Sequence, residues 1–350
     1  MEPRHSVAVL YNHVGEDEYE KIRGIDPSTL DFKPEYDIHV STIQEEYDAI
    51  VNALQKEGFR ARAVNIEENL GKLERLLKGN KPDVVFNLVE FFHDDSKLEA
   101  AVAGLYDLHG VAYTGAPPFA LSVCQRKGLT KQILLANGVP TPRFHLVKTP
   151  EIRRKHHLRY PLIVKPARED ASTGLDKGSV VYEYEALCER LEKVFREFGP
   201  PILVEEFIEG RELHISVLGN NPPRVLPPIE FDFSELPPGY PHLITYDAKW
   251  NPLDEAYHRV HSLCPANLTK AALRKVTDVC VKAYEVVGCR DYARLDVRIG
   301  RRNQVFILEV NPNPGWCWDG HLAKMASFAG MSYQEMLQAI LDAAILRHNI

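Results

Sequence analysis

The chain has 350 residues, of which 45% are hydrophobic and 26% are charged, values that are ordinary for a globular protein with a substantial core. Its formal net charge of −7 leaves no general excess of positive charge to neutralise phosphates, so nucleic-acid binding is not expected. No apolar run approaches the roughly 18–20 residues that cross a membrane, so no membrane association is expected either.

The N-terminal sequence MEPRHSVAVLYNH has a five-residue apolar run, which is too short for the core of a signal peptide and fits a first strand. The six cysteines are scattered without metal-binding spacing. In the absence of an export signal they are expected to be reduced thiols, and the protein is expected to be cytoplasmic.

Residues 1–122 alternate between strand patterns and helix patterns. Strands are predicted in SVAVLY, RARAVNI, DVVFNLV and VAYTGA, and helices in STIQEEYDAIVNALQKEG, LGKLERLLKG and SKLEAAVAGLYDLHG. This alternation indicates parallel βα units joined by right-handed crossovers, so the first domain is expected to be Rossmann-like.

Two further α+β units are predicted, over residues 123–209 and 210–350. The second unit begins with a helix from about Cys124 to Asn137, and contains the strand PLIVKP, a polar loop over 168–178, the strand VVY, a helix to Phe198 and the strand ILVEEF. The third contains an irregular stretch over 232–262, a helix over 267–287, the strand pair ARLDVRI and VFILEV, and a C-terminal helix from Tyr333.

The strand pair of the third unit carries acids among apolar residues. Asp296 lies in ARLDVRI, and Glu309 lies in FILEV after a tight turn, so a hairpin brings both carboxylates to one face. Like charges at that distance repel unless a cation lies between them. With the amide oxygen of Asn311 they form a hard oxygen set that suits Mg²⁺ or Mn²⁺. The alternative is that the acids only pair with neighbouring arginines, namely Arg294, Arg298, Arg301 and Arg302.

Two other stretches have weaker patterns. Lys165 ends the buried strand PLIVKP, and the small-residue loop that follows is able to wrap a phosphate with backbone N–H groups, although an ordinary surface turn explains it equally well. The stretch ILVEEFIEGREL has four acids within eight residues, which indicates either a solvated strand end or a slot for adenine and ribose near Glu206–Ile208.

These pieces, in this order, resemble the ATP-grasp superfamily. The stretches CQRKGLTKQILLANGVPTP, LPPIEF, TYDAKW, CPANLT and SFAGMSYQEML are similar to its D-alanine–D-alanine ligase branch. The resemblance covers nearly the whole chain and is densest over 105–340. It implies a three-domain α/β (α+β) ATP-grasp fold that uses ATP and two Mg²⁺ or Mn²⁺ ions, and dimers are common in the family, so a homodimer is an expectation.

The resemblance also implies roles for individual residues. Lys127, Lys165 and Lys249 would contact ATP phosphates, Glu205 the adenine amine and Glu212 the ribose. The implied nucleotide-binding set is Lys127, Lys165, Ser172, Glu205, Glu206, Phe207, Ile208, Glu212 and Lys249. The implied metal ligands are Asp296, Glu309 and Asn311. The implied catalytic residues are Arg294, which would steady the phosphorylated intermediate, Gly315, whose N–H would meet an oxyanion, and Lys249.

The substrate half departs from the family pattern. D-alanine ligases have His-Gly where this chain has Val89 and Glu90, and paired serines where it has Ala171 and Ser172. Their tyrosine after the loop lysine is Trp250 here, and the serine that takes the second amino acid's carboxylate is Gly320. Bulk and acid therefore replace the D-alanine contacts, and the expected substrate pocket is Glu90, Trp250, Trp316, Trp318, Asp319 and Gly320. Trp316 and Trp318 are alternatively expected to pack between domains.

The sequence therefore predicts an ATP-dependent carboxylate–amine ligase that forms an amide or peptide bond through an acyl phosphate, on amino acids or similar small molecules other than two D-alanines. One alternative is a D-alanine–D-alanine ligase with an atypical site. An alternative of another class is a non-catalytic ATP-binding protein.

Overall fold

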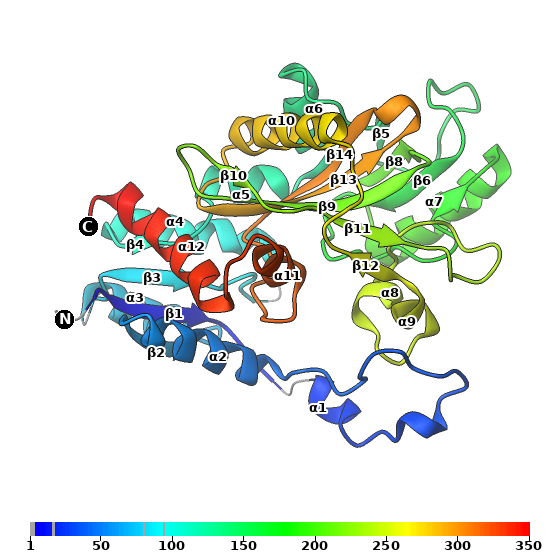
Figure 1. Ribbon diagram of the computed structural model, residues 1–350. Helices are drawn as coiled ribbons and strands as arrows, with labels where there is room; N and C mark the ends of the chain where they lie inside the picture. The colour runs from blue at the N-terminus through cyan, green and yellow to red at the C-terminus, as the bar shows by residue number, and fades with distance from the viewer. Residues whose placement is uncertain (1–3, 16–17, 80, 94) are drawn as a thin grey trace.

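The computed structural model describes residues 4–15, 18–79, 81–93 and 95–350, and its strands form three separate sheets (Figure 1). Among these residues, no helix combines the length and the apolar character of a membrane span. The combination of helices and sheets, with a first sheet that is parallel, agrees with the predicted fold class.

The first sheet has the order β2-β1-β3-β4, and all its neighbouring strands are parallel, as the βα alternation predicts. The strands are β1 (Ser6–Tyr11), β2 (Arg60–Asn65), β3 (Val84–Asn87) and β4 (Ala112–Tyr113). The helices of this part are α1 (Glu18–Ile22), η1 (Pro27–Thr29), α2 (Ile43–Lys56), α3 (Leu70–Lys78), η2 (Ser96–Leu98) and α4 (Glu99–His109). A capping box between Thr42 and Glu45 fixes the start of α2.

The second sheet is antiparallel, with the order β5-β8-β6-β7, and α7 packs against it. Its elements are β5 (Phe144–Val147), β6 (Leu162–Pro166), β7 (Val180–Val181), α7 (Tyr184–Phe198) and β8 (Ile202–Glu206). The sequence did not indicate β5.

The third sheet has the order β12-β11-β9-β13-β14, with β10 paired to β9. Its strands are β9 (Arg211–Leu218), β10 (Arg224–Val225), β11 (Ile229–Asp232), β12 (His261–Leu263), β13 (Tyr292–Ile299) and β14 (Val305–Pro312). The helices between them are α8 (Tyr246–Trp250), α9 (Glu255–Arg259), α10 (Lys270–Val286) and η3 (Arg301–Asn303). Two short helices and a strand thus occur at 232–263, where the sequence indicated only irregular structure.

One face of this third sheet is apolar. Alternate residues of β9 and β13, among them Leu213, Ile215, Leu295 and Val297, join a core with buried residues of α10. Two helices that precede the second sheet, α5 (Pro118–Cys124) and α6 (Lys127–Ala136), pack against β14 as well. A break at 125–126 therefore divides the helix predicted over Cys124–Asn137, and most of its residues lie in α6, which packs on the third sheet.

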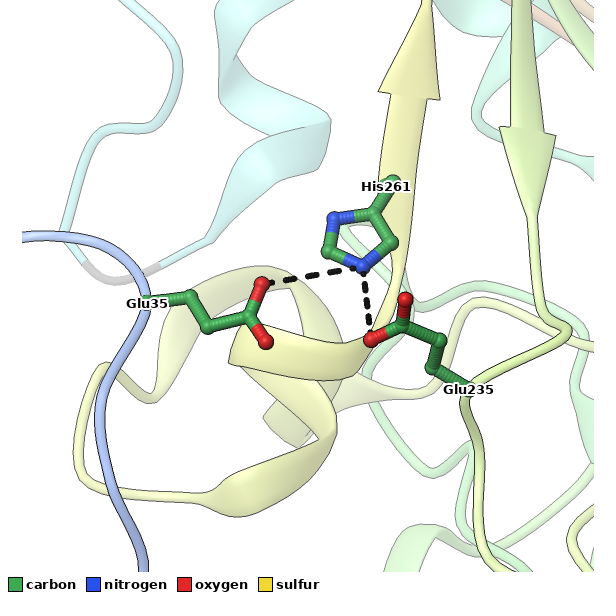
Figure 2. A group of neighbouring side chains, drawn as sticks. All are labelled: Glu35, Glu235 and His261. Carbon is green, nitrogen blue, oxygen red and sulfur yellow. Dashed lines mark ion pairs between the residues drawn. The ribbon is translucent and has the colours of Figure 1, made fainter.

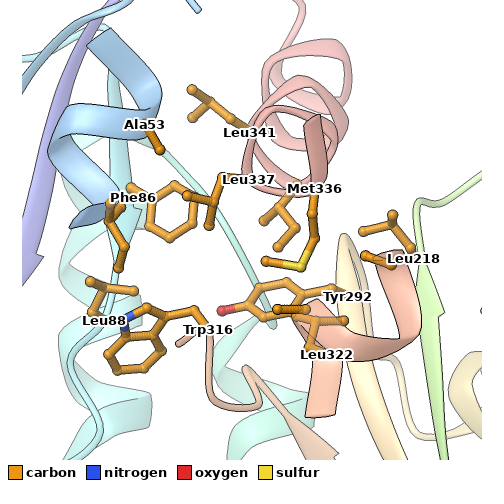
Figure 3. Close-up of a cluster of buried hydrophobic side chains, with 14 of the residues drawn as sticks. Ala53, Phe86, Leu88, Leu218, Tyr292, Trp316, Leu322, Met336, Leu337 and Leu341 are labelled. Atoms are coloured by element: carbon orange, nitrogen blue, oxygen red, sulfur yellow. The ribbon is translucent and has the colours of Figure 1, made fainter. Parts of the chain in front are cut away.

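The C-terminal helix α12 (Tyr333–His348) returns to the first sheet, and α11 (His321–Phe328) before it packs on β9 and on α12. Figure 3 shows residues of α12 meeting Phe86 of β3 and Leu88, which follows that strand, with Tyr292 and Leu218 of the third sheet on the other side. Trp316 belongs to this interdomain core, where it is only 7% exposed and its ring lies 6.2 Å from that of Tyr47. The expectation that Trp316 walls a substrate pocket is thereby corrected, because its ring is buried among apolar side chains.

The segment 23–42, between α1 and α2, reaches from the first domain to α9. The backbone N–H groups of Glu35 and Tyr36 both donate to Nδ1 of His258, at 3.1 Å each, and His258 is fully buried. Arg259 pairs with Glu35 at 2.7 Å. Figure 2 shows His261 between the carboxylates of Glu35 and Glu235, at 3.7 and 3.2 Å. Because Arg259 already neutralises Glu35, we interpret the cluster as an ion-pair network that ties the first domain to residues 232–262.

Asp291 joins three parts of the chain. Its buried carboxylate accepts hydrogen bonds from the N–H of Gly115 at 2.8 Å, from Asn220 at 2.9 Å and from Nη2 of Arg347 at 2.7 Å. Gly115 has a φ of +92° and lies so close to Asn313 that a Cβ would fall 2.1 Å from its side-chain oxygen, so glycine is required there.

Asp291→Asn should destabilise the protein by about 3–5 kcal/mol, because it leaves the Arg347 guanidinium with no carboxylate in a largely buried position. Asparagine tolerates the left-handed backbone at this position, where φ is 64°, so the change tests the charge and not the backbone. Urea unfolding measures the effect, with Asp342→Asn on the exposed side of α12 as the control. Equal midpoints for the two variants would contradict the prediction.

Candidate active site

A cavity that is partly open to solvent lies between the second and third sheets. It collects the charged residues that the sequence singled out from six separate stretches of chain. Its lining includes Lys127, Lys165, Ser172, Glu205, Glu206, Phe207, Ile208, Glu212, Lys249, Arg294, Asp296, Glu309 and Asn311. The nucleotide and metal sets implied by the resemblance thus share one cavity.

The floor of the cavity is the polar face of the third sheet. In the antiparallel register, Asp296 lies opposite His214 of β9 on one side and opposite Glu309 of β14 on the other. The register shifts between Asp296 and Val297, and this β-bulge inserts Leu308 as an extra residue of β14. Val305 and Ile307 consequently face the apolar core, whereas Leu308 and Glu309 both line the cavity.

Each acid of the floor is neutralised by a cation of the same site. Lys127 contacts Glu309 at 2.5 Å and Asp170 at 3.0 Å, and Nε of Arg294 contacts Asp296 at 2.8 Å. Burial alone would raise the pKa of Glu309 and of Asp296, but Lys127 and Arg294 respectively lower it. Both groups are therefore carboxylates at neutral pH.

Glu205 is held between two lysines. It lies 2.7 Å from Nζ of Lys131 and 2.6 Å from Nζ of Lys165, and it is 1% exposed. In this arrangement the Glu205 carboxylate orients the lysines, a role different from the adenine contact that the resemblance implies. The sequence analysis missed Lys131, although its position one helical turn after Lys127 could have indicated it.

Glu212 is held by Arg298, which the sequence indicated only as an alternative partner of Asp296 and Glu309. Arg298 lies directly opposite Glu212 in the β9–β13 register, and their side chains form an ion pair. Arg298 also donates to the carbonyl oxygen of Ile208 at 2.9 Å. Arg298 therefore belongs to the lining of the cavity and not to the pair of Asp296 and Glu309.

The loop 168–178 and the segment 232–262 contact each other across the cavity. The indole N–H of Trp250 donates to the carbonyl oxygen of Ala171 at 2.7 Å, and the N–H of Tyr246 donates to that of Leu175 at 3.0 Å. Leu243 and Ile244 complete the wall. The role of Trp250 in the structure is therefore to join the two loops.

The other residues expected to recognise substrate lie outside the lining of this cavity. Trp318 and Asp319 are exposed. Asp319 lies near Glu46 of α2 and Cys317, and a carboxylate oxygen of each acid and the sulfur of Cys317 lie within 4.8 Å of one another. Glu90 is open to solvent but close enough to Lys249 for their charges to interact. Gly315 and Gly320 lie in the same loop, and a Cβ on Gly315 would meet open space.

The comparisons with known proteins agree with this geometry. Residues 133–342 match the family model described as D-ala D-ala ligase C-terminus. A protein of Sinorhizobium fredii described as uncharacterized protein y4sG is 32% identical over 86% of this chain and 88% of its own length. D-alanine–D-alanine ligase of Carboxydothermus hydrogenoformans is 31% identical over 84% of this chain and 90% of its own length.

Solved structures show the same fold. D-alanine–D-alanine ligase of Bacillus anthracis superposes with a TM-score of 0.74 at 20% identity, over 99% of each chain. A second structure of that enzyme, complexed with ATP, gives a TM-score of 0.71 at 19% identity.

Lys249 lowers the stability of the fold at neutral pH. Burial, together with the charge of Arg294, lowers the pKa of Lys249 to about 8 from a usual value of 10.5. The folded state therefore disfavours the ammonium, so Lys249→Met should stabilise the protein at pH 7, by on the order of 3 kcal/mol.

The stabilisation by Lys249→Met should shrink as pH rises from 8 to 10.5. In this range the folded wild-type protein loses the buried ammonium charge of Lys249, whereas the unfolded chain keeps that charge up to about pH 10.5. Denaturant unfolding of both proteins at pH 7 and pH 9.5 measures the difference. A Lys249→Met variant that is less stable at pH 7 would contradict the low pKa.

Proposed function

The chain belongs to the D-alanine–D-alanine ligase family of ATP-grasp enzymes. On that premise we propose that it joins the carboxylate of one substrate to the amine of another, and that the two substrates are not both D-alanine. As a member of this family it is an ATP-dependent ligase. The observation that carries the proposal is the cavity that gathers Lys127, Lys165, Lys249 and Arg294 with three oxygen ligands, while the expected D-alanine contacts are replaced.

ATP would lie in this cavity with its phosphates among the lysines. Lys165 and Lys127 come from different elements, β6 and α6, and Lys249 comes from α8. Their convergence supplies charge for the phosphates, and the neighbouring Glu212 and Ile208 offer a carboxylate and backbone groups for ribose and adenine. A pure ATP-binding protein would not need the additional acids on the floor.

Asp296, Glu309 and Asn311 suit Mg²⁺ or Mn²⁺. Asp296 and Glu309 are opposed in the register, and a metal ion between them would take over the neutralising role that Arg294 and Lys127 have in this structure. The Asn311 side chain lies beside Asp296, where its amide helps to lower the pKa of that carboxyl, so its oxygen would be near a metal ion held by Asp296. Two such ions would offset phosphate charge in the transition state.

The reaction would have two steps. A substrate carboxylate oxygen attacks the γ-phosphorus of ATP, which gives an acyl phosphate and ADP. An amine then attacks the acyl carbon, the bond to the phosphate oxygen breaks, and an amide and inorganic phosphate result. Arg294 would hold the transferred phosphoryl group, the N–H of Gly315 would meet the tetrahedral oxyanion, and the joined loops 168–178 and 232–262 would exclude water.

The proposed partner is a cationic or bulky amine. Gly320 offers no side chain for a second carboxylate, and Asp319 and Glu90 would repel one. Two like charges about 4 Å apart cost on the order of 1 kcal/mol in water, and more in a cleft. An extra ammonium group or an aromatic ring would instead be favoured by these acids and by the exposed Trp318.

The deciding experiment is a screen of amino acids and small acids for ADP release, with mass spectrometry of the product. Amide formation with a larger or cationic amine, and D-alanyl-D-alanine formation that is much slower, would support the proposal. Formation of D-alanyl-D-alanine at a rate matching the best other pair would favour an atypical D-alanine ligase. No ADP from any mixture would favour the non-catalytic protein.

Glu309→Gln should reduce turnover by on the order of 100-fold or more, because it removes a metal-binding charge from the floor. The fold should survive, because Lys127 keeps its contact with Asp170. Steady-state ADP release and thermal unfolding measure the two effects, with the exposed Glu209→Gln as the control. Retained turnover in Glu309→Gln would remove Glu309 from the metal site.

Asp319→Ala and Trp318→Ala should change which amine is accepted, because both residues are exposed beside the oxyanion glycine. Loss of the negative charge should raise the relative rate with neutral amines and lower it with cationic ones. ATP affinity should stay unchanged, since neither residue lines the cavity. An unaltered amine profile in both variants would show that the backbone, and not these side chains, recognises the partner.

A further inference from the structure

Arg298 is the largest of the side chains that are almost completely buried, at 1% exposed. A guanidinium is seldom fully buried, and it then needs partners for its charge and its N–H groups. Its three partners come from two segments, residues 208–212 and residue 242. Nη1 donates to the carbonyl oxygen of Ile208 at 2.9 Å, and Nη2 donates both to the Glu212 carboxylate and to the carbonyl oxygen of His242.

Two of these partners belong to the proposed nucleotide end of the cavity. Ile208 and Glu212 are the residues expected to meet adenine and ribose, and Phe207, which precedes Ile208, packs on Arg298, with the guanidinium carbon 4.4 Å from the ring centroid. Glu212 and Arg298 are neighbours in the β9–β13 register, so this pair is built into the sheet. The inference that follows rests on the proposed function of this cavity.

The third partner belongs to the segment that carries Lys249. His242 precedes Leu243 and Ile244, which line the cavity, and Thr245, whose side chain caps α8 by accepting from the N–H of Ala248. Lys249 lies on that single helical turn. The position of the His242 carbonyl therefore affects where the Lys249 ammonium lies.

We propose that Arg298 is a positioning residue that couples occupation of the base and ribose end of the cavity to closure of segment 232–262. Separating the buried guanidinium from Glu212 would cost several kcal/mol, so Arg298 stays with Glu212 whether the segment is open or closed. A nucleotide that orders Glu212 and Ile208 also orders the guanidinium. The ordered guanidinium offers a fixed donor to the His242 carbonyl and favours the closed segment.

The coupling is reciprocal. If the contact with His242 forms only in the closed state, closure must raise nucleotide affinity by the same factor by which the nucleotide favours closure. Closure in turn brings Lys249 to the phosphates and excludes water from an acyl phosphate. One side chain would thus link nucleotide recognition to the step that protects the intermediate.

Hydrogen exchange of the backbone amides of residues 242–250 tests the coupling, with and without a saturating non-hydrolysable ATP analogue and Mg²⁺. Wild-type protein should show at least a tenfold slowing on addition of the analogue. Arg298→Met should show no slowing at saturation, and its dissociation constant for the analogue should rise at least tenfold. Arg301→Met is the matched control, because that side chain lies on the same hairpin and is 90% exposed.

Arg298→Lys keeps the charge beside Glu212 but does not reproduce the planar set of donors that serves three acceptors. It should bind the analogue more tightly than Arg298→Met and still lack the slowing, and it serves as the test if Arg298→Met does not fold. Wild-type slowing in either saturated Arg298 variant would overturn the inference and leave the proposed function intact. Failure of wild-type protein to bind the analogue would refute the proposed function, and this inference with it.

Discussion

The neutralisation of buried charge on the polar face of the third sheet is the constraint on which the rest of the site depends. Arg294, Asp296 and Arg298 alternate along β13 and all enter one cavity with Glu309 and Glu212. Charges at such depth are stable only when each has a partner of opposite sign. The chain meets this need internally with cation–carboxylate pairs. On binding, phosphates would become partners of the cations, and metal ions would become partners of the carboxylates.

This exchange gives the cavity its chemical character. Lys127 bridges Glu309 and Asp170, and Glu205 orients Lys131 and Lys165, so the cations are held by acids before any ligand arrives. Ordered charges of this kind need little reorganisation when a phosphoryl group is transferred. The cost appears in Lys249, because burial lowers the pKa of its ammonium to about 8, and a nearby phosphate would offset that cost.

The first domain contributes to the site from outside the cavity. Its core with α12 buries Trp316 and so fixes the start of the loop 315–320, while segment 23–42 holds His258 and Arg259, which belong to segment 232–262. Asp291 fastens the same arrangement through Gly115 and Arg347. The region expected to choose the amine, around the loop 315–320, thus depends on the first domain, whereas the nucleotide cavity depends on the other two sheets.

The sequence alone determined the first sheet, several strands of the other two, the order of the motifs and most of the cavity lining, because alternation of apolar residues and short motifs are local properties. It did not reveal why Glu309 lies in an apolar strand. A strict two-residue period places Val305, Ile307 and Glu309 on one face, and only the β-bulge at Leu308 turns the carboxylate to the cavity. Lys131, Arg298 and the contacts of segment 23–42 were missed, and Trp316 was misplaced, for a common reason. Which buried charges become partners, and which aromatic rings fill an interdomain core, depends on residues that are far apart in the chain and meet only in the tertiary structure.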